Sequence, residues 1–308
     1  MDASGQCFEW SLVKDERAMS NPWVAGLRLA AIVLLSLVML AGSAVLNLIP
    51  DGRRAHHKRA RRWSKTWMRA TLGILGVRIV VRGPLPPVGS FLAPNHLGYL
   101  DPLGIGAVIP CAFVVAAETA RWPGIGALLR ASRQVFLERF DRGKQLAHTS
   151  HDIRRRLAHG EAVCAFLEGT STDGSCVLPF HPALLESAIR LSAPVVPIAV
   201  HWSAINPKID IGEDVAYWKD HVFRRHAWRL LGLSGIRCEI VFGNPILSSG
   251  ADRKVLAALL RARVLELLRP GSLTEVCTGH PFPSGGARGT NLAEDAISVP
   301  LADPSVQS

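Results

Sequence analysis

The longest apolar stretch of the chain lies near its N-terminus. No charged residue occurs from Leu29 to Leu46, and the apolar character continues to Pro50. As a helix, residues 29–50 would be about 33 Å long, enough to span the hydrocarbon core of a bilayer. Trp23 stands near one end, where membrane helices are enriched in tryptophan. The pattern predicts a membrane helix over residues 29–50, preceded by a polar N-terminal segment over residues 1–28.

Two alternatives to a membrane-crossing helix stay open. The small residues at positions 41–44 resemble the cleavage site of a signal peptide, although the apolar run is long and starts late. Ser36, Gly42, Ser43 and Asn47 dilute the segment, which would also suit a helix that dips into the membrane without crossing it.

The pattern of residues 51–76 predicts a basic amphipathic helix. Trp63, Trp67, Ala70 and Ile74 recur at helical spacing and form one apolar stripe, as in a helix that lies in the headgroup plane of a membrane. The alternative is a solvated basic helix that packs its tryptophans on its own domain. The cationic residues of the opposite face are Lys58, Arg61, Arg62, Lys65 and Arg69.

The positive charge of the chain is local. The formal net charge is +10, and eight Lys or Arg against one Asp between Asp51 and Ala70 account for 8 − 1 = +7 of it. A cationic block next to an apolar segment favours a membrane with anionic lipid over nucleic acid as partner. Because positive flanks stay in the cytoplasm, we expect the domain that follows on the cytoplasmic side of the cell inner membrane.

From Val77 onwards short apolar runs alternate with amphipathic ones. This alternation predicts an α/β domain over residues 77–269, with a mixed sheet flanked by helices on both faces. The Pro- and Gly-rich residues 270–308 lose all hydrophobic periodicity, which predicts a disordered tail. The expected strands are 77–81, 91–93, 113–117, 134–137, 163–167, 195–200 and 238–242. The expected helices are 102–108, 125–132, 143–159, 183–191 and 253–268, with a further one within 217–231.

The candidate chemistry lies after the second predicted strand. His96 and Asp101 are five positions apart, and on one helix their side chains would diverge. Gly98 permits a bend that returns Asp101 towards the imidazole. A carboxylate that fixes the imidazole tautomer leaves the other ring nitrogen as a general base. The alternative is local: Asp101 caps a helix that has Pro102 at its first position, and His96 is an ordinary loop histidine.

Three further stretches follow this one in order. A Pro/Gly turn at residues 122–126 precedes a strand that ends near Arg139. The guanidinium of Arg139 could bind an anion with two hydrogen bonds. Glu168 ends an apolar strand and is followed by Gly169, Thr170 and Ser171; a carboxylate at the edge of a core needs a partner or a function. Residues 195–198 form a last apolar strand.

Together these stretches resemble the conserved blocks of the glycerolipid acyltransferase family, over roughly residues 92–200. Asn95-His96 with Asp101 is similar to the family's H-x-x-x-x-D block, and residues 166–171 to its F-P-E-G-T-R-S block. The resemblance implies that His96 and Asp101 are catalytic. It implies that the acceptor is bound by Asn95, Arg139, Glu168, Gly169, Thr170 and Ser171.

Two positions depart from the family pattern. Leu167 replaces a proline, and Ser171 replaces an arginine, which removes one positive charge from the expected phosphate site. Residues 172–174 and 178–180 look more like the branch that acylates lyso-ornithine lipid, whose head group is an amino acid.

The resemblance implies an O-acyltransferase of lipid biosynthesis that works at the membrane. His96, oriented by Asp101, would deprotonate the hydroxyl of a lysolipid, either 1-acylglycerol-3-phosphate or lyso-ornithine lipid. The acyl donor would be acyl-CoA or acyl carrier protein, and backbone N–H groups near the loop or at the helix start would meet the oxyanion. No cofactor and no metal are expected.

The competing hypothesis is a non-enzymatic, membrane-tethered module that binds anionic lipid or nucleic acid through residues 53–69. It explains the charge but not the four ordered blocks. Other chemistries lack their motifs, because the sequence has no G-x-S-x-G elbow, no P-loop and no C-x-x-C pair. His148 and His151 beside Asp152 could ligate a metal, but the arginines at 154–156 favour a solvated helix face.

Overall fold

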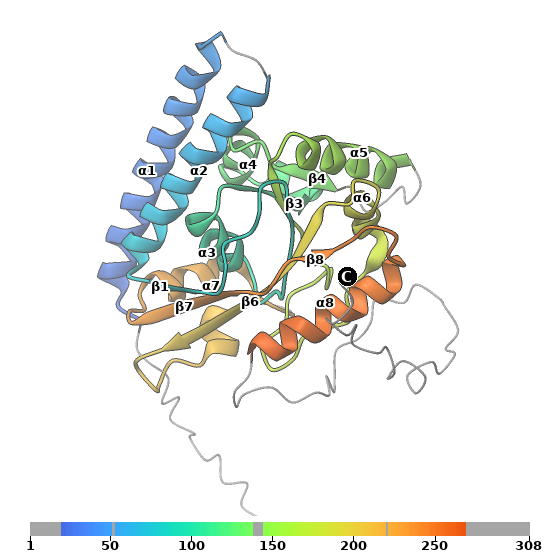
Figure 1. Ribbon diagram of the computed structural model, residues 1–308. Coiled ribbons are helices and arrows are strands. Elements are labelled where there is room, and N and C mark those ends of the chain that lie inside the picture. Colours follow the sequence, from blue (N-terminus) through green and yellow to red (C-terminus); the bar gives the residue numbers. More distant parts are fainter. Residues whose placement is uncertain (1–19, 51–52, 138–143, 220, 269–308) are drawn as a thin grey trace, which may run out of the picture. The chain divides into compact units, whose positions relative to one another are not determined.

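The computed structural model describes residues 20–50, 53–137, 144–219 and 221–268 (Figure 1). The predicted tail at 270–308 and residues 1–19 of the predicted N-terminal segment lie outside these ranges.

One mixed sheet organises the described part of the chain. Its strand order is β1-β7-β6-β2-β5-β3-β4, and β8 pairs with β6. All neighbouring pairs are parallel except β6 with β7 and β6 with β8. The strands are β1 (Arg78–Arg82), β2 (Phe91–Pro94), β3 (Cys111–Ala116), β4 (Val135–Leu137), β5 (Ala162–Cys164), β6 (Pro194–Ala204), β7 (Ile236–Phe242) and β8 (Ile246–Leu247).

Helices cover both faces of this sheet (Figure 1). One core contains side chains of α1 (Pro22–Leu48), α2 (Arg53–Leu75), α3 (Leu100–Val108) and α7 (Phe223–Leu231). The other contains side chains of α5 (Lys144–Ala158), α6 (Glu186–Ile189) and α8 (Arg253–Leu268). The remaining elements are α4 (Ile125–Ala131) and the short helices η1 (Ala117–Arg121), η2 (Pro182–Leu185) and η3 (Ile211–Val215).

Strand β2 shows why helices must cover both faces of the sheet. Its four residues are all buried, and successive side chains of a strand point to opposite faces. Phe91 and Ala93 therefore lie in the α5/α6/α8 core, whereas Leu92 lies in the α1/α2/α3/α7 core. The predicted α/β class, a mixed sheet flanked by helices, is confirmed.

The N-terminal helix begins earlier than predicted. Asn21 caps it by accepting the backbone N–H groups of Trp23 and Val24, and Pro22 occupies its first turn. Arg28, whose charge suggested a boundary before Leu29, lies inside the helix. Its guanidinium donates to the backbone carbonyl of Leu231 at 3.0 Å. The cation is thus satisfied by the C-terminal end of α7, so residues 22–28 are helical rather than a polar segment.

The tryptophan stripe of α2 packs on α1, contrary to the prediction that it faces lipid. The Trp63 indole donates to the Met39 carbonyl at 2.9 Å, and the Trp67 indole donates to the Ser36 hydroxyl at 3.2 Å. The alternative interpretation, in which the tryptophans pack within the protein, describes these contacts. Two of the residues that dilute the apolar run of α1 lie in this contact: Ser36 accepts the Trp67 hydrogen bond, and Gly42 leaves room for the Trp63 ring.

The opposite face of α2 is not uniformly solvated either. Arg61 is buried, donates to the Ser132 carbonyl at 2.7 Å and lies 3.7 Å from the Glu161 carboxylate. Burial, together with the nearby charge of Arg156, lowers the pKa of Arg61 to about 9. Lys65 donates to the Val108 carbonyl at the end of α3. These cations attach α2 to the domain and are not free to bind lipid.

Candidate active site

The loop between β2 and α3 carries His96 and is fixed at several points. The Asn95 amide donates to the Val200 carbonyl at 3.0 Å and accepts the Val200 N–H at 2.7 Å. A Cβ atom at Gly98 would lie 2.8 Å from the backbone nitrogen of Tyr217, so the close approach requires glycine there. Asn95 therefore anchors the loop to β6, and its predicted role in acceptor binding stays a prediction.

His96 and Asp101 meet as predicted. The imidazole Nδ1 lies 2.8 Å from Asp101 Oδ2. Because a carboxylate oxygen accepts, Nδ1 carries the proton and Nε2 is the free basic nitrogen. The His96 side chain is 21 % exposed, so a substrate can reach it, whereas Asp101 is fully buried. The pair has the geometry of an oriented general base.

Asp101 does not cap its helix, which corrects the local alternative. Helix α3 begins at Leu100, so Asp101 lies inside the first turn. Its Oδ2 accepts the backbone N–H groups of Leu97 at 2.6 Å and Gly98 at 2.8 Å. The carboxylate thus folds the preceding loop around itself and holds the imidazole at the same time.

The sequence did not single out Trp202, which donates from its indole Nε1 to Asp101 Oδ1 at 2.7 Å. The predicted strand stopped at Val200, because His201 interrupts the apolar run. Pairing with β7 carries β6 on to Ala204, so His201 faces solvent and Trp202 faces the core. The period-two alternation after Val200 is the signal that could have identified Trp202.

Segment 166–172 encloses His96 from the other side. The Phe166 ring stacks on the imidazole, with centroids 3.9 Å apart and planes inclined by 23°. The His96 N–H donates to Glu168 Oε1 at 2.7 Å, and the Thr172 N–H donates to the His96 carbonyl at 3.0 Å. The first and third predicted blocks, 72 positions apart in the chain, therefore form one structure around the histidine.

Glu168 is engaged by the backbone on both oxygens. Besides the His96 N–H, it accepts the Leu178 N–H on Oε2 at 2.7 Å, and its side chain is buried. Burial raises the pKa of Glu168 to about 8, while the two N–H hydrogen bonds oppose this rise. The described contacts make Glu168 a positioning residue for the loop, and its predicted role in acceptor binding stays a prediction.

The other residues predicted to bind the acceptor differ in their surroundings. Gly169 and Thr170 are exposed beside His96, and Gly169 adopts a left-handed φ of +74°. The Ser171 hydroxyl donates to the Tyr217 carbonyl at 2.5 Å and so attaches segment 166–172 to the backbone at residue 217. Arg139 lies outside the described residues.

The loop N–H groups expected to meet an oxyanion are already taken. Those of Leu97 and Gly98 bond to Asp101, and that of His96 bonds to Glu168. The predicted contribution of N–H groups at the start of α3 stays a prediction.

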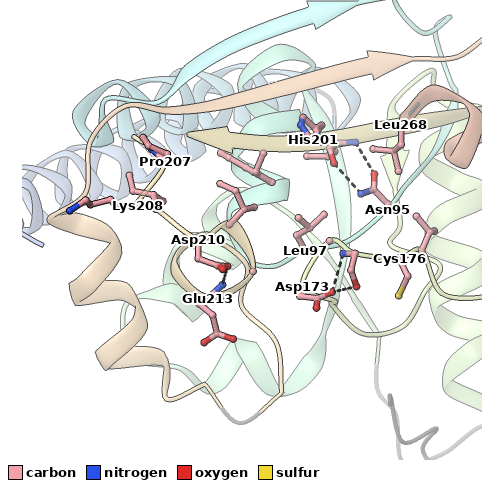
Figure 2. A pocket seen from close by; sticks show the side chains of 18 residues that line it. Asn95, Leu97, Asp173, Cys176, His201, Pro207, Lys208, Asp210, Glu213 and Leu268 are labelled. Carbon is pink, nitrogen blue, oxygen red and sulfur yellow. Dashed lines mark hydrogen bonds between the residues drawn. The ribbon is translucent and has the colours of Figure 1, made fainter. Parts of the chain in front are cut away.

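A cavity of about 750 Å³ lies behind this loop (Figure 2). Asn95, Leu97 and Trp202 line one side of it, and residues 173–177 and 207–213 line the others. His96 is not among its lining residues, whereas its two neighbours in the chain, Asn95 and Leu97, are. Its charged lining residues are Asp173, Lys208, Asp210 and Glu213.

Comparison with known proteins identifies relatives of the described domain. The family model described as Acyltransferase matches residues 77–201. A lyso-ornithine lipid O-acyltransferase from Brucella abortus is 31 % identical over 79 % of this chain and 93 % of its own length. Its counterpart from Rhodobacter capsulatus is 32 % identical over 75 % of this chain and 86 % of its own length.

More distant similarity extends to a second acceptor class. A 1-acyl-sn-glycerol-3-phosphate acyltransferase from Neisseria meningitidis is 29 % identical over 49 % of this chain and 62 % of its own length. The crystal structure of the 1-acyl-sn-glycerophosphate acyltransferase PlsC from Thermotoga maritima superposes with a TM-score of 0.51 at 20 % identity. It covers 79 % of this chain and 99 % of that chain. At this identity the structure supports the fold alone.

Proposed function

Because the chain belongs to the glycerolipid acyltransferase family and is an acyltransferase, we propose that His96 and Asp101 transfer an acyl group to the free hydroxyl of a lysolipid at a membrane surface. The observation that carries the proposal is the oriented His96–Asp101 pair, with the partly exposed imidazole beside Gly169 and Thr170. Membership of this enzyme family excludes the alternative hypothesis of a non-enzymatic, membrane-tethered binding module.

The reaction follows from the free Nε2 of His96. It takes the proton of the acceptor hydroxyl as that oxygen attacks the thioester carbonyl carbon. The resulting tetrahedral intermediate collapses when its C–S bond breaks, and the imidazolium returns its proton to the leaving thiolate. An ester and a free thiol are formed, and no acyl-enzyme is needed. Asp101 keeps the imidazole in the required tautomer and stabilises the transient cation. The donor is proposed to be acyl-CoA or acyl carrier protein.

We propose lyso-ornithine lipid as the acceptor, ahead of 1-acylglycerol-3-phosphate. Relatives that act on lyso-ornithine lipid match most of this chain. The absence of an arginine at position 171 supports the same choice, since a phosphate would lose one bidentate partner there.

The membrane contact is proposed to be made by α1. The helix is long and apolar enough to cross a membrane, and only 11 % of its most apolar window is buried. Its inward face is attached to the domain near both ends, by Arg28 to Leu231 and by Asn47 to Arg133. If α1 crossed the membrane, the charged domain attached to it would enter the hydrocarbon layer. We therefore infer that α1 lies in one leaflet of the cell inner membrane without crossing it, with the domain in the cytoplasm.

The test uses membranes or detergent-purified protein with a labelled acyl donor and either acceptor. Wild type should acylate lyso-ornithine lipid, and His96→Ala should lose roughly 10³-fold or more in rate while keeping its melting temperature. An unchanged rate in His96→Ala would refute the mechanism. Acylation of 1-acylglycerol-3-phosphate alone would refute the choice of acceptor.

A further inference from the structure

Three tryptophans are the only large aromatic side chains that are exposed among the described residues. Trp23 is 83 % exposed, Trp228 is 44 % exposed and Trp122 is 39 % exposed. Isolated exposed apolar residues need no explanation, but a group of tryptophans at one place does.

All three belong to one region around α7. Trp23 lies in the first turn of α1, and that end of α1 is fixed to the end of α7 by the Asn21 N–H donating to the Gly232 carbonyl at 3.2 Å (Figure 1). Trp228 lies on α7 itself. The Trp122 ring meets Phe223, the first residue of α7, with centroids 5.4 Å apart.

Helix α7 has a buried and an exposed side. His226, Leu230 and Leu231 are buried against the domain. Trp228 points the other way, and exposed Arg224 and Arg225 precede it by four and three positions, which places them on the same side. A tryptophan next to arginines on an exposed helix face is typical of a helix at a membrane interface.

We propose that the outward face of α7, formed by Arg224, Arg225 and Trp228, docks on the surface of a membrane that contains anionic lipid. The proposal rests on the proposed function at a membrane. Two features identify the occupant: the arginines complement anionic head groups, and the helix end fixed to α7 carries the exposed apolar residues Trp23 and Leu27. The membrane contact thus extends beyond the N-terminal helix.

This contact would place the active site at the membrane boundary. Phe223 packs its ring against Tyr99 with centroids 5.3 Å apart, and Tyr99 follows the His96 loop directly. The Tyr99 hydroxyl in turn lies 2.9 Å from His226 Nδ1 on the inner face of α7. One helix therefore touches the proposed membrane surface and the catalytic loop.

The first test measures whether Trp228 reaches lipid. Full-length protein is bound to phosphatidylcholine vesicles with about 30 % phosphatidylglycerol, some of whose chains are brominated to quench nearby tryptophan emission. Trp228→Phe should lose roughly one third of the quenched emission, if the three exposed tryptophans contribute equally. Trp218→Phe removes a buried indole and should leave the quenched part unchanged. Equal quenching in Trp228→Phe and wild type, or an equal loss in Trp218→Phe, would overturn the proposal.

The second test measures the role of charge. The double variant Arg224→Gln/Arg225→Gln should lose up to roughly 30-fold in transfer rate to acceptor in those vesicles at limiting lipid, and nothing with acceptor dispersed in detergent. The matched control Arg253→Gln/Lys254→Gln makes the same charge change on exposed positions of α8 and should show no such loss. A loss with both forms of acceptor, or in both variants, would overturn docking by α7. If wild type transfers no acyl group at all, the proposed function fails, and the quenching experiment still decides on docking.

Discussion

Two buried carboxylates hold His96, and they do so in different ways. Asp101 lies five positions from the histidine and binds the imidazole ring together with two N–H groups of the same loop. Glu168 comes from another part of the sheet and binds only the backbone N–H of His96 and that of Leu178. The first fixes the tautomer of the ring, and the second fixes the position of the loop. Chemistry and placement are therefore separable by mutation.

The largest effect is expected at Asp101. Asp101→Asn keeps the shape but replaces one oxygen by an NH₂ group and removes the negative charge, so the imidazolium that forms during transfer loses its stabilising anion. We expect the transfer rate to fall roughly 10²- to 10³-fold, with little change in KM, because the lost interaction matters most when the imidazole is protonated.

Steady-state kinetics on both acceptors would measure this effect. Circular dichroism and thermal melting serve as the fold control, since the amide can still accept one hydrogen bond. A rate within twofold of wild type in a folded Asp101→Asn protein would show that Asp101 only shapes the loop.

Glu168→Gln should mainly change stability and its dependence on pH. One of the two N–H groups would face an amide donor, at a cost of about 1–3 kcal/mol. Burial raises the pKa of Glu168 from 4.5 in the unfolded chain to about 8 in the folded protein. The folded state then binds the proton more tightly, so this residue contributes stability that is present below pH ~4.5 and is lost as pH rises towards 8.

Chemical denaturation between pH 5 and 8, compared for wild type and Glu168→Gln, isolates this contribution, because other titrating groups cancel in the difference. The stability gap should narrow as pH rises. Glu266→Gln makes the same change on the exposed end of α8 and should give a gap close to zero at every pH. A gap between wild type and Glu168→Gln that is independent of pH would mean that the two N–H donors keep Glu168 ionised throughout.

The two carboxylates also differ in how far sequence could predict them. The His96–Asp101 pair is local: five positions and one glycine limit its geometry, and the structure shows the expected contact. The partners of Glu168 depend on how strands β2 and β5 pair, which no local pattern contains. Most strands were predictable because they contain apolar runs, whereas β8 and the continuation of β6 to Ala204 were not predicted. The packing of α2 was not, since its tryptophan stripe suits lipid and α1 equally well.

Trp202 extends the comparison to the far side of Asp101. Trp202→Phe keeps most of the ring but removes the indole donor to Asp101 Oδ1. A hydrogen bond to a charged group contributes about 1.5–3 kcal/mol, so we expect a loss of roughly tenfold or somewhat more in kcat with KM unchanged. Trp218→Phe is the matched control, because that buried indole donates to the Gly212 carbonyl instead. Equal effects of the two substitutions on kcat would assign Trp202 to packing alone.

The smallest expected effect is a change in acceptor preference on substitution of Ser171, in segment 168–172. Ser171→Arg restores the cation that the family places there, at the position whose hydroxyl now donates to the Tyr217 carbonyl. The new guanidinium should favour a phosphate-bearing acceptor by a few-fold up to roughly tenfold in relative kcat/KM, the size of one charge-assisted hydrogen bond in a partly exposed site. Competition between 1-acylglycerol-3-phosphate and lyso-ornithine lipid in one reaction measures this ratio directly, and Ser171→Gln controls for side-chain length without charge. If the ratio stays constant in Ser171→Arg, acceptor choice is made elsewhere, and segment 168–172 serves only to hold His96 in place.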